Sequence, residues 1–300
     1  MELDGPPLRR IVQGRNEKAM KRLFAAIFIL ATWAVLDAAP IWAANEATFQ
    51  RDLTITGRLD LTVATGAGFI HLTSGPPDRV HVFARVRAGW GVSDQMIQDI
   101  AAHPPIQQTG NIVRIGADHR NLGNVSIEYE IQAPPDTYLD ASTGSGNIID
   151  NGVGSNAKLG TGSGSIQATN LQGGFTVHTG SGNIDAAQSG AGDVKASTGS
   201  GTIVLKYVHG GLEAGTGSGN IRVDGTPSAP WRLHTGSGSV ELWTGGAGLT
   251  LDASTGSGGI HSDRDIISHG TMDRHHVKGS IGAGGPEVHV STGSGSIRIH

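Results

Sequence analysis

The chain has 300 residues, of which 47 are glycine, 37% are hydrophobic and 5% are aromatic. With so few large apolar side chains, we expect a core built from small aliphatic residues rather than a large globular interior. The formal net charge of −4 argues against nucleic acid as a partner, and the lack of cysteine excludes disulfides, thiolate metal sites and a cysteine nucleophile.

Residues 1–43 have the organisation of a secretory signal segment. Two basic residues precede an uncharged apolar run, residues 23–36, and small residues follow it. We predict a signal peptide cleaved after Ala43, with Met20 as an alternative start of translation. The alternative is an uncleaved membrane anchor, although the apolar run is shorter than the roughly 18 residues of a spanning helix. Both readings predict export to the periplasm, the cell surface or the medium, with membrane contact only through this segment.

Residues 44–135 lack a regular period and are predicted to form an N-terminal cap. Alternating apolar and polar residues predict strands over residues 80–87, 111–115 and 125–132. Ser93 starts a predicted short helix that runs to residue 102 and stops before two prolines. Residues 59–70 carry apolar residues at the intervals of the later repeats, so a first, irregular coil is expected there.

Residues 136–300 repeat with a period of 18 to 20 residues. A degenerate copy at residues 279–281 follows an inserted stretch, residues 263–276, and brings the total to nine units. Such a period with one turn signature per unit predicts an all-β fold, a β-solenoid (β-helix) in which each coil lies on the one before it. The tetrapeptide Thr-Gly-Ser-Gly begins at Thr143, Thr161, Thr179, Thr198, Thr216, Thr235, Thr255 and Thr292.

Apolar residues hold fixed positions relative to each of these threonines. The positions four and two residues before the threonine are always apolar, which is the alternation of a strand. Continuing that alternation points the motif threonine and serine inward, as an internal hydrogen-bonded ladder; the alternative is an external hydroxyl face that orders water. The position five residues after the threonine is also apolar and is predicted to face inward, and it holds Ile148, Ile166, Ile184, Ile203, Ile221, Val240, Ile260 and Ile297.

A polar column lies between the apolar ones and is predicted to face solvent. Its signs alternate from Lys195 onward, and neighbouring coils are about 4.8 Å apart, so in-register stacking predicts exposed ion pairs. Such pairs support the register and add little stability. Down the chain the column reads Asp140, Lys158, Thr176, Lys195, Glu213, Arg232 and Asp252.

The recurrent Thr-Gly-Ser-Gly-Asn/Ser-Ile units, the lead-in over residues 125–134 and the helical segment that ends at two prolines together resemble a bacterial family of candidate adhesins with β-strand repeats. The resemblance covers residues 46–300. It implies an exported solenoid module at the bacterial surface, with an adhesin role that is itself inferred from fold, and it supplies no active site to carry over.

Histidine and carboxylate residues gather near the C-terminal end, where six of the 13 histidines lie in the last forty residues. His269, Asp273, His275 and His276 are the candidates for a zinc, copper or nickel site. These residues lack a fixed ligand spacing, so the favoured interpretation of this segment is a solvated surface loop. The sequence argues against a calcium-binding β-roll, because isoleucine stands where such a repeat places aspartate, and calcium needs oxygen ligands.

Nothing in the repeats predicts catalysis or a cofactor, because no histidine recurs with the motif serines and the acidic residues are scattered. We therefore expect an exported, non-enzymatic adhesin or envelope interaction module whose partner is an unidentified protein or glycan. Outward residues such as Trp243, Arg222, Glu241 and His261 are expected to supply contacts. The alternatives are a polysaccharide-acting β-helix enzyme and a metal-binding surface protein.

Overall fold

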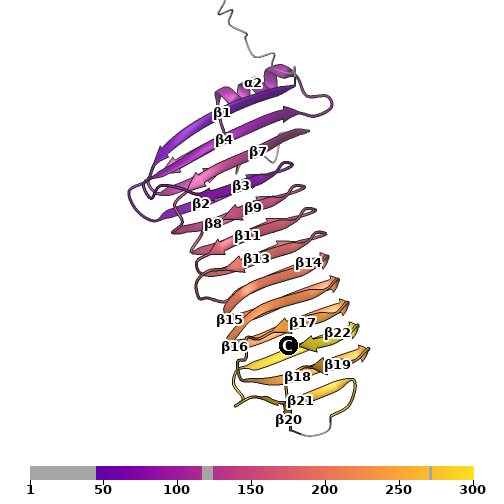
Figure 1. Ribbon diagram of the computed structural model, residues 1–300. Coiled ribbons are helices and arrows are strands. Elements are labelled where there is room, and N and C mark those ends of the chain that lie inside the picture. Colours follow the sequence, from indigo (N-terminus) through magenta and orange to yellow (C-terminus); the bar gives the residue numbers. More distant parts are fainter. Residues whose placement is uncertain (1–44, 117–123, 270–271) are drawn as a thin grey trace, which may run out of the picture. The chain divides into compact units, whose positions relative to one another are not determined.

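The computed structural model describes residues 45–116, 124–269 and 272–300, which belong to one compact unit, Ala44–His300. The predicted signal peptide lies outside the described residues. Within them the chain forms 23 strands, all hydrogen-bonded into a continuous sheet, and one helix. The strands lie side by side from β1 to β20 (Figure 1). This arrangement confirms the predicted all-β solenoid with a helix near its N-terminal end.

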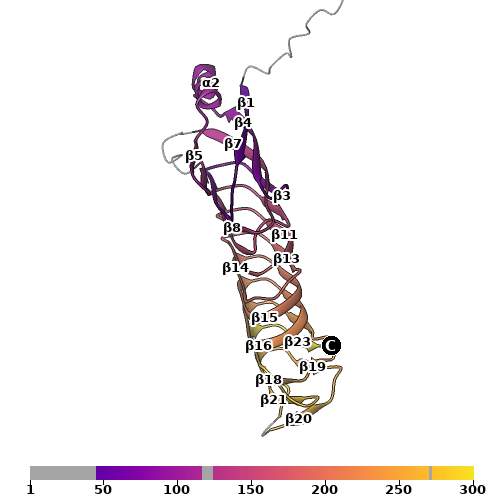
Figure 2. The ribbon, with the colours of Figure 1, turned by 90° about the vertical axis from the view of Figure 1, so that its left-hand side faces the viewer.

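Each coil contributes one strand to each of two faces, and turns join the two rows of strands (Figure 2). The strands that lead into the Gly-Ser-Gly turn form what we call the first face: β2 (Leu59–Thr65), β8 (Thr137–Thr143), β10 (Asn156–Thr161), β12 (Gly174–Thr179), β14 (Val194–Ser200), β18 (Leu249–Ser257) and β22 (Glu287–Ser294). The strands that leave the turn form the second face: β3 (Ile70–Ser74), β9 (Ile148–Asn151), β11 (Ile166–Leu171), β13 (Ile184–Gln188), β17 (Val240–Trp243), β19 (Ile260–Ser262) and β23 (Ile297–Ile299). Two longer strands, β15 (Ile203–Ser218) and β16 (Ile221–Ser237), bend from the second face of one coil into the first face of the next.

The first coil, β2 and β3, pairs directly with β8 and β9, although an excursion of some sixty residues separates them in the chain. On the second face, β1 (Glu46–Thr54), β4 (Arg79–Ala88) and β7 (Val125–Ala133) form an antiparallel extension beside β3. On the first face, the hairpin of β5 (Ile106–Thr109) and β6 (Ile112–Ile115) lies beside β2. Helix α2 (Asp94–Ala102) contacts β1 and β4, and the Ser93 side chain caps it.

The last repeat does not lie at the end of the stack. Strand β22 pairs in parallel with β16 on one side and with β18 on the other. Strand β23 likewise lies between β17 and β19. The expectation that every coil lies on its predecessor in the chain is therefore wrong for this repeat, which is inserted between two earlier ones; β22 can be followed in yellow in Figure 1.

The degenerate copy at residues 279–281 is not a coil. It belongs to β21 (His276–Ile281), which runs antiparallel along β18 and pairs on its other side with β20 (Ile266–Ser268). This segment lacks the motif threonine, whose hydroxyl joins each regular coil to its neighbour. Because β21 covers the far edge of β18, the last repeat pairs with the remaining edge of that strand and with β16.

The motif threonines are buried and donate their hydroxyls to a glycine carbonyl in the adjacent coil. Thr161 Oγ1 donates to the carbonyl oxygen of Gly146 at 2.8 Å, and Thr292 Oγ1 donates to that of Gly238 at 2.8 Å. The motif serines are exposed instead, for example Ser163 and Ser181. The prediction that serine joins threonine inside is wrong, because the chain leaves the strand alternation at the glycine that follows the threonine. All eight threonines make this bond: Thr143, Thr161, Thr179, Thr198, Thr216, Thr235, Thr255 and Thr292.

The aliphatic column forms one continuous spine on the second face. In spatial order it contains Ile70, Ile148, Ile166, Ile184, Ile203, Ile221, Val240, Ile297 and Ile260. Every member is buried except Ile260, which is half-buried in the coil that follows the inserted repeat. Among larger side chains, Trp231 is fully buried, and its Nε1 donates to the carbonyl oxygen of Gly210 at 2.9 Å.

Candidate functional site

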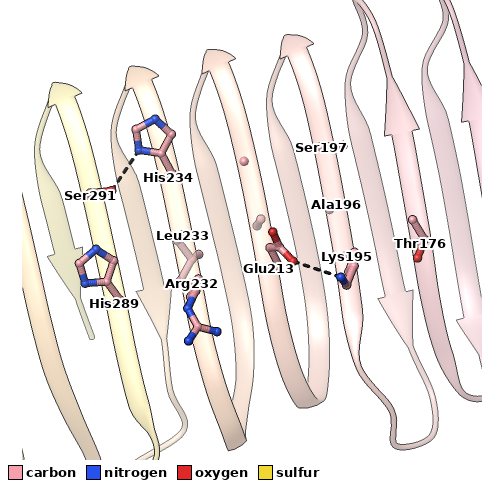
Figure 3. A pocket seen from close by; sticks show the side chains of 12 residues that line it. Thr176, Lys195, Ala196, Ser197, Glu213, Arg232, Leu233, His234, His289 and Ser291 are labelled. Atoms are coloured by element: carbon pink, nitrogen blue, oxygen red, sulfur yellow. Dashed lines mark hydrogen bonds and ion pairs between the residues drawn. The ribbon is translucent and has the colours of Figure 1, made fainter.

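A groove crosses five neighbouring strands of the first face, from β12 to β22 (Figure 3). We call it the central groove. Its volume is about 460 Å³, which is within the range of small-molecule and saccharide-sized sites. The lining residues are Thr176, Lys195, Ala196, Ser197, Glu213, Ala214, Gly215, Arg232, Leu233, His234, His289 and Ser291.

Gly215 makes the floor of the central groove. It faces outward between Ser197 on β14 and His234 on β16, its in-register neighbours. A Cβ at this position would meet nothing closer than the carbonyl oxygen of His234 at 3.9 Å. Within the groove, Gly215 is the one residue of this column that has no side chain, and its lack of a side chain opens the hollow.

A row of charged side chains forms one wall of the central groove. Lys195 Nζ lies 3.3 Å from Glu213 Oε2, and both side chains are exposed. Arg232 follows in register beside Glu213, and no ion pair of Arg232 is found within the part of the chain that the structure describes. The wall thus offers two cations for one carboxylate, and Figure 3 shows the Arg232 side chain apart from the Lys195–Glu213 pair.

Imidazole and hydroxyl groups form the opposite wall. His234 Nδ1 lies 3.0 Å from Ser291 Oγ. On β12, at one end of the groove, His178 Nδ1 lies 2.9 Å from Ser197 Oγ, which itself lines the groove. These groups can donate or accept hydrogen bonds, so this wall suits a ligand rich in hydroxyl groups.

The predicted ladder of charges is only partly continuous. Lys158 Nζ lies 3.2 Å from Asp140 Oδ2, as in-register stacking predicts. Arg232 and Asp252 are not neighbours, because the inserted repeat places His289 between them. Asp252 instead contacts His276 and Lys278 of β21, at 3.1 and 3.9 Å.

The other outward residues named from the sequence lie together on the second face. Arg222 Nε lies 3.1 Å from Glu241 Oε2. The Trp243 ring stacks on that of His300, with ring centroids 4.8 Å apart. Near them His261 Nε2 lies 3.1 Å from Asp263 Oδ1, at a hollow of about 510 Å³ lined by β19 and β23.

Asp263 is shared by two histidines. His300 Nδ1 lies 2.7 Å from Asp263 Oδ2, while His261 lies near the other carboxylate oxygen. The hydrogen bond from His300, followed by the charges of both histidines, lowers the pKa of Asp263. Each carboxylate oxygen thus already has a partner.

The four candidate metal ligands are not gathered into one site. His269 Nε2 lies 2.7 Å from Ser280 Oγ, and His276 Nε2 lies 3.1 Å from Asp252 Oδ1. Asp273 Oδ1 accepts backbone hydrogen bonds from His275 and His276, which lower the pKa of Asp273. Among residues 45–116, 124–269 and 272–300, no group of three or more His, Asp or Glu side chains is placed to hold a metal ion.

Asp150 is a buried carboxyl group in an otherwise apolar column of the repeat. It stands in register between Leu72 and Ala168, where neighbouring coils place apolar residues. Oδ1 accepts a hydrogen bond from the Val153 amide at 3.0 Å, whereas Oδ2 has no partner within the described residues. Burial raises the pKa of Asp150 to about 7, against the smaller lowering effect of the Val153 hydrogen bond.

Sequence reasoning followed the outward column three residues before each motif threonine and missed the column one residue before it. That second column contains the groove residues Ser197, Gly215, His234 and Ser291. The available signal was Gly215, a glycine outside the conserved turn of the repeat and next to the motif threonine Thr216.

The long sheet of stacked coils is consistent with the fold of a known family. A protein-family model described as Toastrack DUF4097, a domain of unknown function, matches residues 108–300. The chain belongs to the Toastrack family. The family resemblance expected from the sequence is confirmed at the level of the family, and the Toastrack match begins in the β5 hairpin that flanks the first coil.

Several solved structures are similar to this chain at low sequence identity. A candidate adhesin from Bacteroides fragilis is 14% identical over 85% of this chain and 97% of its own, with a TM-score of 0.35. A candidate adhesin from Parabacteroides merdae is 12% identical over 86% and 97%, with a TM-score of 0.29. A candidate lipid-binding protein from Parabacteroides distasonis is 15% identical over 86% and 98%, with a TM-score of 0.32. No curated protein matches the sequence.

The helical content of the described Toastrack chain is small. Its helix α2 has 9 residues, and within the described ranges no helix has the length and apolar character needed to cross a bilayer.

Proposed function

We propose that this Toastrack protein is an exported, non-enzymatic interaction module of the bacterial envelope that binds its partner through the central groove. The observation that carries the proposal is that inward side chains stabilise the stack, whereas outward side chains form the groove. Threonine, glycine and isoleucine inside the coils hold the stack together. The groove is assembled from outward side chains of five strands, which that stack holds in fixed register.

The groups that line the groove are available to a ligand. Arg232 is exposed and has no ion pair within the described residues, and the Lys195–Glu213 pair is exposed on both sides. Exposed pairs of this kind contribute about 0–1 kcal/mol, so a ligand group can replace Glu213 as the partner of Lys195 at small cost.

The composition of the groove supports binding over glycoside hydrolysis. Hydrolysis requires two carboxyl groups on opposite sides of the scissile bond. Glu213 is the one carboxylate among the groove's lining residues. A smaller hollow of about 290 Å³ on the other side of the same charged row contains both Asp193 and Glu213, but Asp193 Oδ1 already accepts from the Gly211 amide at 2.9 Å.

Occluding the groove tests the proposal. Gly215→Thr places a β-branched side chain on the groove floor, in a strand position where that residue type is favourable. Gly160→Thr is the matched control, because Gly160 occupies the same outward column on β10, outside the groove, with nothing within 4 Å of an added Cβ. The assay is co-sedimentation of tagged protein, isolated from cells that express the full chain, with an envelope fraction.

We expect wild type and Gly160→Thr to co-sediment equally and Gly215→Thr to lose most of its binding. Equal co-sedimentation of both variants would overturn the assignment to the groove. Wild type could instead release reducing sugar from envelope glycans. If Gly215→Thr lost that activity, the protein would be a polysaccharide-acting enzyme rather than a binding module.

Export is tested separately by cell fractionation of the tagged full chain. We expect the protein in the periplasm, at the surface or in the medium, because residues 23–36 follow two basic residues in the order of a signal segment. Recovery of folded protein only from the cytoplasm would contradict the envelope role.

A further inference from the structure

We propose that the central groove binds an acidic glycan, with sugar carboxylates on Lys195 and Arg232 and sugar hydroxyls on the histidine–serine wall. This inference rests on the proposed function and names the class of its ligand. The arrangement of charges, the paired strands beneath the groove and the chemistry of its lining lead to this assignment.

Cations recur on alternate strands along the outward column that contains the charged wall. Lys158 is on β10, Lys195 on β14 and Arg232 on β16, with β12 and β15 between them. Because neighbouring strands are 4.7–4.9 Å apart, successive cations are spaced by about 10 Å along the stack. An extended polysaccharide has sugar residues of similar length to the strand spacing, so a carboxylate on every second sugar would meet successive cations.

The position of the groove excludes the usual mode of peptide capture. A peptide that adds to a sheet needs an unpaired strand edge. Beneath the groove, β12, β14, β15, β16 and β22 are each paired on both sides. A ligand in this groove must therefore be recognised by side chains on the face of the sheet, and it must run across the strands.

The lining favours an acidic sugar over a neutral one. The twelve described residues that line the groove include no Phe, Tyr or Trp, so the large apolar rings that would favour stacking on a neutral sugar are not among them. They include two permanent cations, which recognise carboxylates by charge-assisted hydrogen bonds. On the other wall, Ser197, His234 and Ser291 offer hydroxyl and ring nitrogen groups that suit sugar hydroxyls.

The neighbouring hollow is a poorer anion site, although it shares Lys195, Glu213 and Arg232. Asp193 also lines it, so two carboxylates there offset the two cations. The central groove contains one carboxylate and two cations, so the balance of charge favours an anionic ligand there rather than in the neighbouring hollow.

Isothermal titration of the tagged, cell-exported protein with defined polymers tests the assignment. The acidic probe is hyaluronan, an unsulfated polymer with a carboxylate on alternate sugars. Dextran is the neutral glycan, and poly-glutamate is the acidic polymer without sugar. We expect wild type to bind hyaluronan at low salt, with an affinity that falls as salt rises, and to bind dextran and poly-glutamate at least tenfold more weakly.

Two charge variants complete the test. Lys195→Gln with Arg232→Gln removes both groove cations from exposed positions, and we expect at least a tenfold loss of hyaluronan affinity. Lys206→Gln is the control, because Lys206 is also an exposed lysine paired with a carboxylate, Asp185, at 3.0 Å, but it lies outside the groove. A double variant that binds like wild type, or equal binding of poly-glutamate or dextran, would overturn the acidic-glycan assignment.

The two proposals fail in different ways. If Gly215→Thr abolishes envelope binding and wild type does not bind hyaluronan, the binding role of the groove is supported and the acidic-glycan assignment is wrong. If wild type binds hyaluronan through Lys195 and Arg232 but does not associate with envelope fractions, the assignment stands and the envelope role falls.

Discussion

Thr179 Oγ1 donates a hydrogen bond of 2.8 Å to the carbonyl oxygen of Gly164 in the adjacent coil. A Cβ on Gly182, three residues after Thr179, would lie 1.9 Å from that same oxygen. One carbonyl oxygen thus explains two positions of the Thr-Gly-Ser-Gly motif, because the threonine must donate to it and the second glycine must leave room for it. The same pair of contacts recurs at Thr161 and Gly164 against Gly146.

The Thr179→Val variant tests the hydrogen bond at nearly constant volume. It leaves the carbonyl of Gly164 without its hydroxyl donor inside the coil, so we expect the free energy of unfolding to fall by about 1–3 kcal/mol. Ser181→Ala is the control, since Ser181 is exposed and its loss should change stability by no more than about 0.5 kcal/mol. Urea unfolding measures both; an equal or larger effect of Ser181→Ala would contradict the inward role of threonine alone.

The Gly182→Ala variant tests the close approach of neighbouring coils. Because the added methyl group would overlap the carbonyl of Gly164, the coils must separate locally, and we expect a loss of about 1–3 kcal/mol. Gly160→Ala provides the comparison, as nothing lies within 4 Å of its Cβ. That change should be neutral or stabilise the protein by about 0.4–1 kcal/mol. Similar melting temperatures for the two variants would show that coil spacing does not depend on Gly182.

The sequence predicts most of the coil because coil structure is local. The recurrent motif and the strand alternation around it assign Ile148 and its equivalents to one column, and both are read from the chain segment by segment. Strand alternation predicts that Ser181 faces the inside of the coil, but Ser181 is exposed. The alternation ends where the chain turns after Thr179. Asp150 stands seven residues after Thr143, a position that is apolar in the neighbouring coils, so its place in the repeat indicates burial although its residue type does not.

The spatial order of the last coils could not be predicted, because several repeats have strand edges with the same sequence pattern and any of them could pair with the last repeat. Thr292 pairs in register with Thr235 on one side and Thr255 on the other. Those three repeats carry the same motif, so local pattern alone cannot decide which of them are neighbours. The central groove depends on this order as well, because His289 and Ser291 enter it only through the inserted repeat.

Two isoleucine variants test the inserted position of the last repeat. Ile297 is fully buried between β17 and β19, so Ile297→Ala should cost about 2–5 kcal/mol. Ile260→Ala should cost less, because Ile260 is half-buried in a coil that has a regular neighbour on one side of its second face. Stacking in chain order would place Ile297 at the end and reverse the two effects. Chemical denaturation of both variants distinguishes the two orders.

Asp150 predicts a pH dependence of stability with a definite sign. Burial raises its folded-state pKa from 3.8 to about 7, so between these values the folded protein binds this proton and the unfolded chain releases it. Because the folded state then holds more protons, the free energy of unfolding falls as pH rises from about 4 to about 7, by up to about 1.4 kcal/mol per pH unit from this group. Above the folded-state pKa the contribution becomes constant.

The Asp150→Asn variant isolates that contribution from those of the other titrating groups. Asparagine keeps an oxygen to accept from the Val153 amide and carries no ionisable proton, so the pH-dependent cost of a buried charge disappears. We expect the stability difference, variant minus wild type, to increase from about pH 4 to about pH 7 and then to level off. Urea unfolding across this range measures the difference. If it stays constant or decreases, Asp150 is ionised at little cost in the folded protein, and its Oδ2 must have a polar partner.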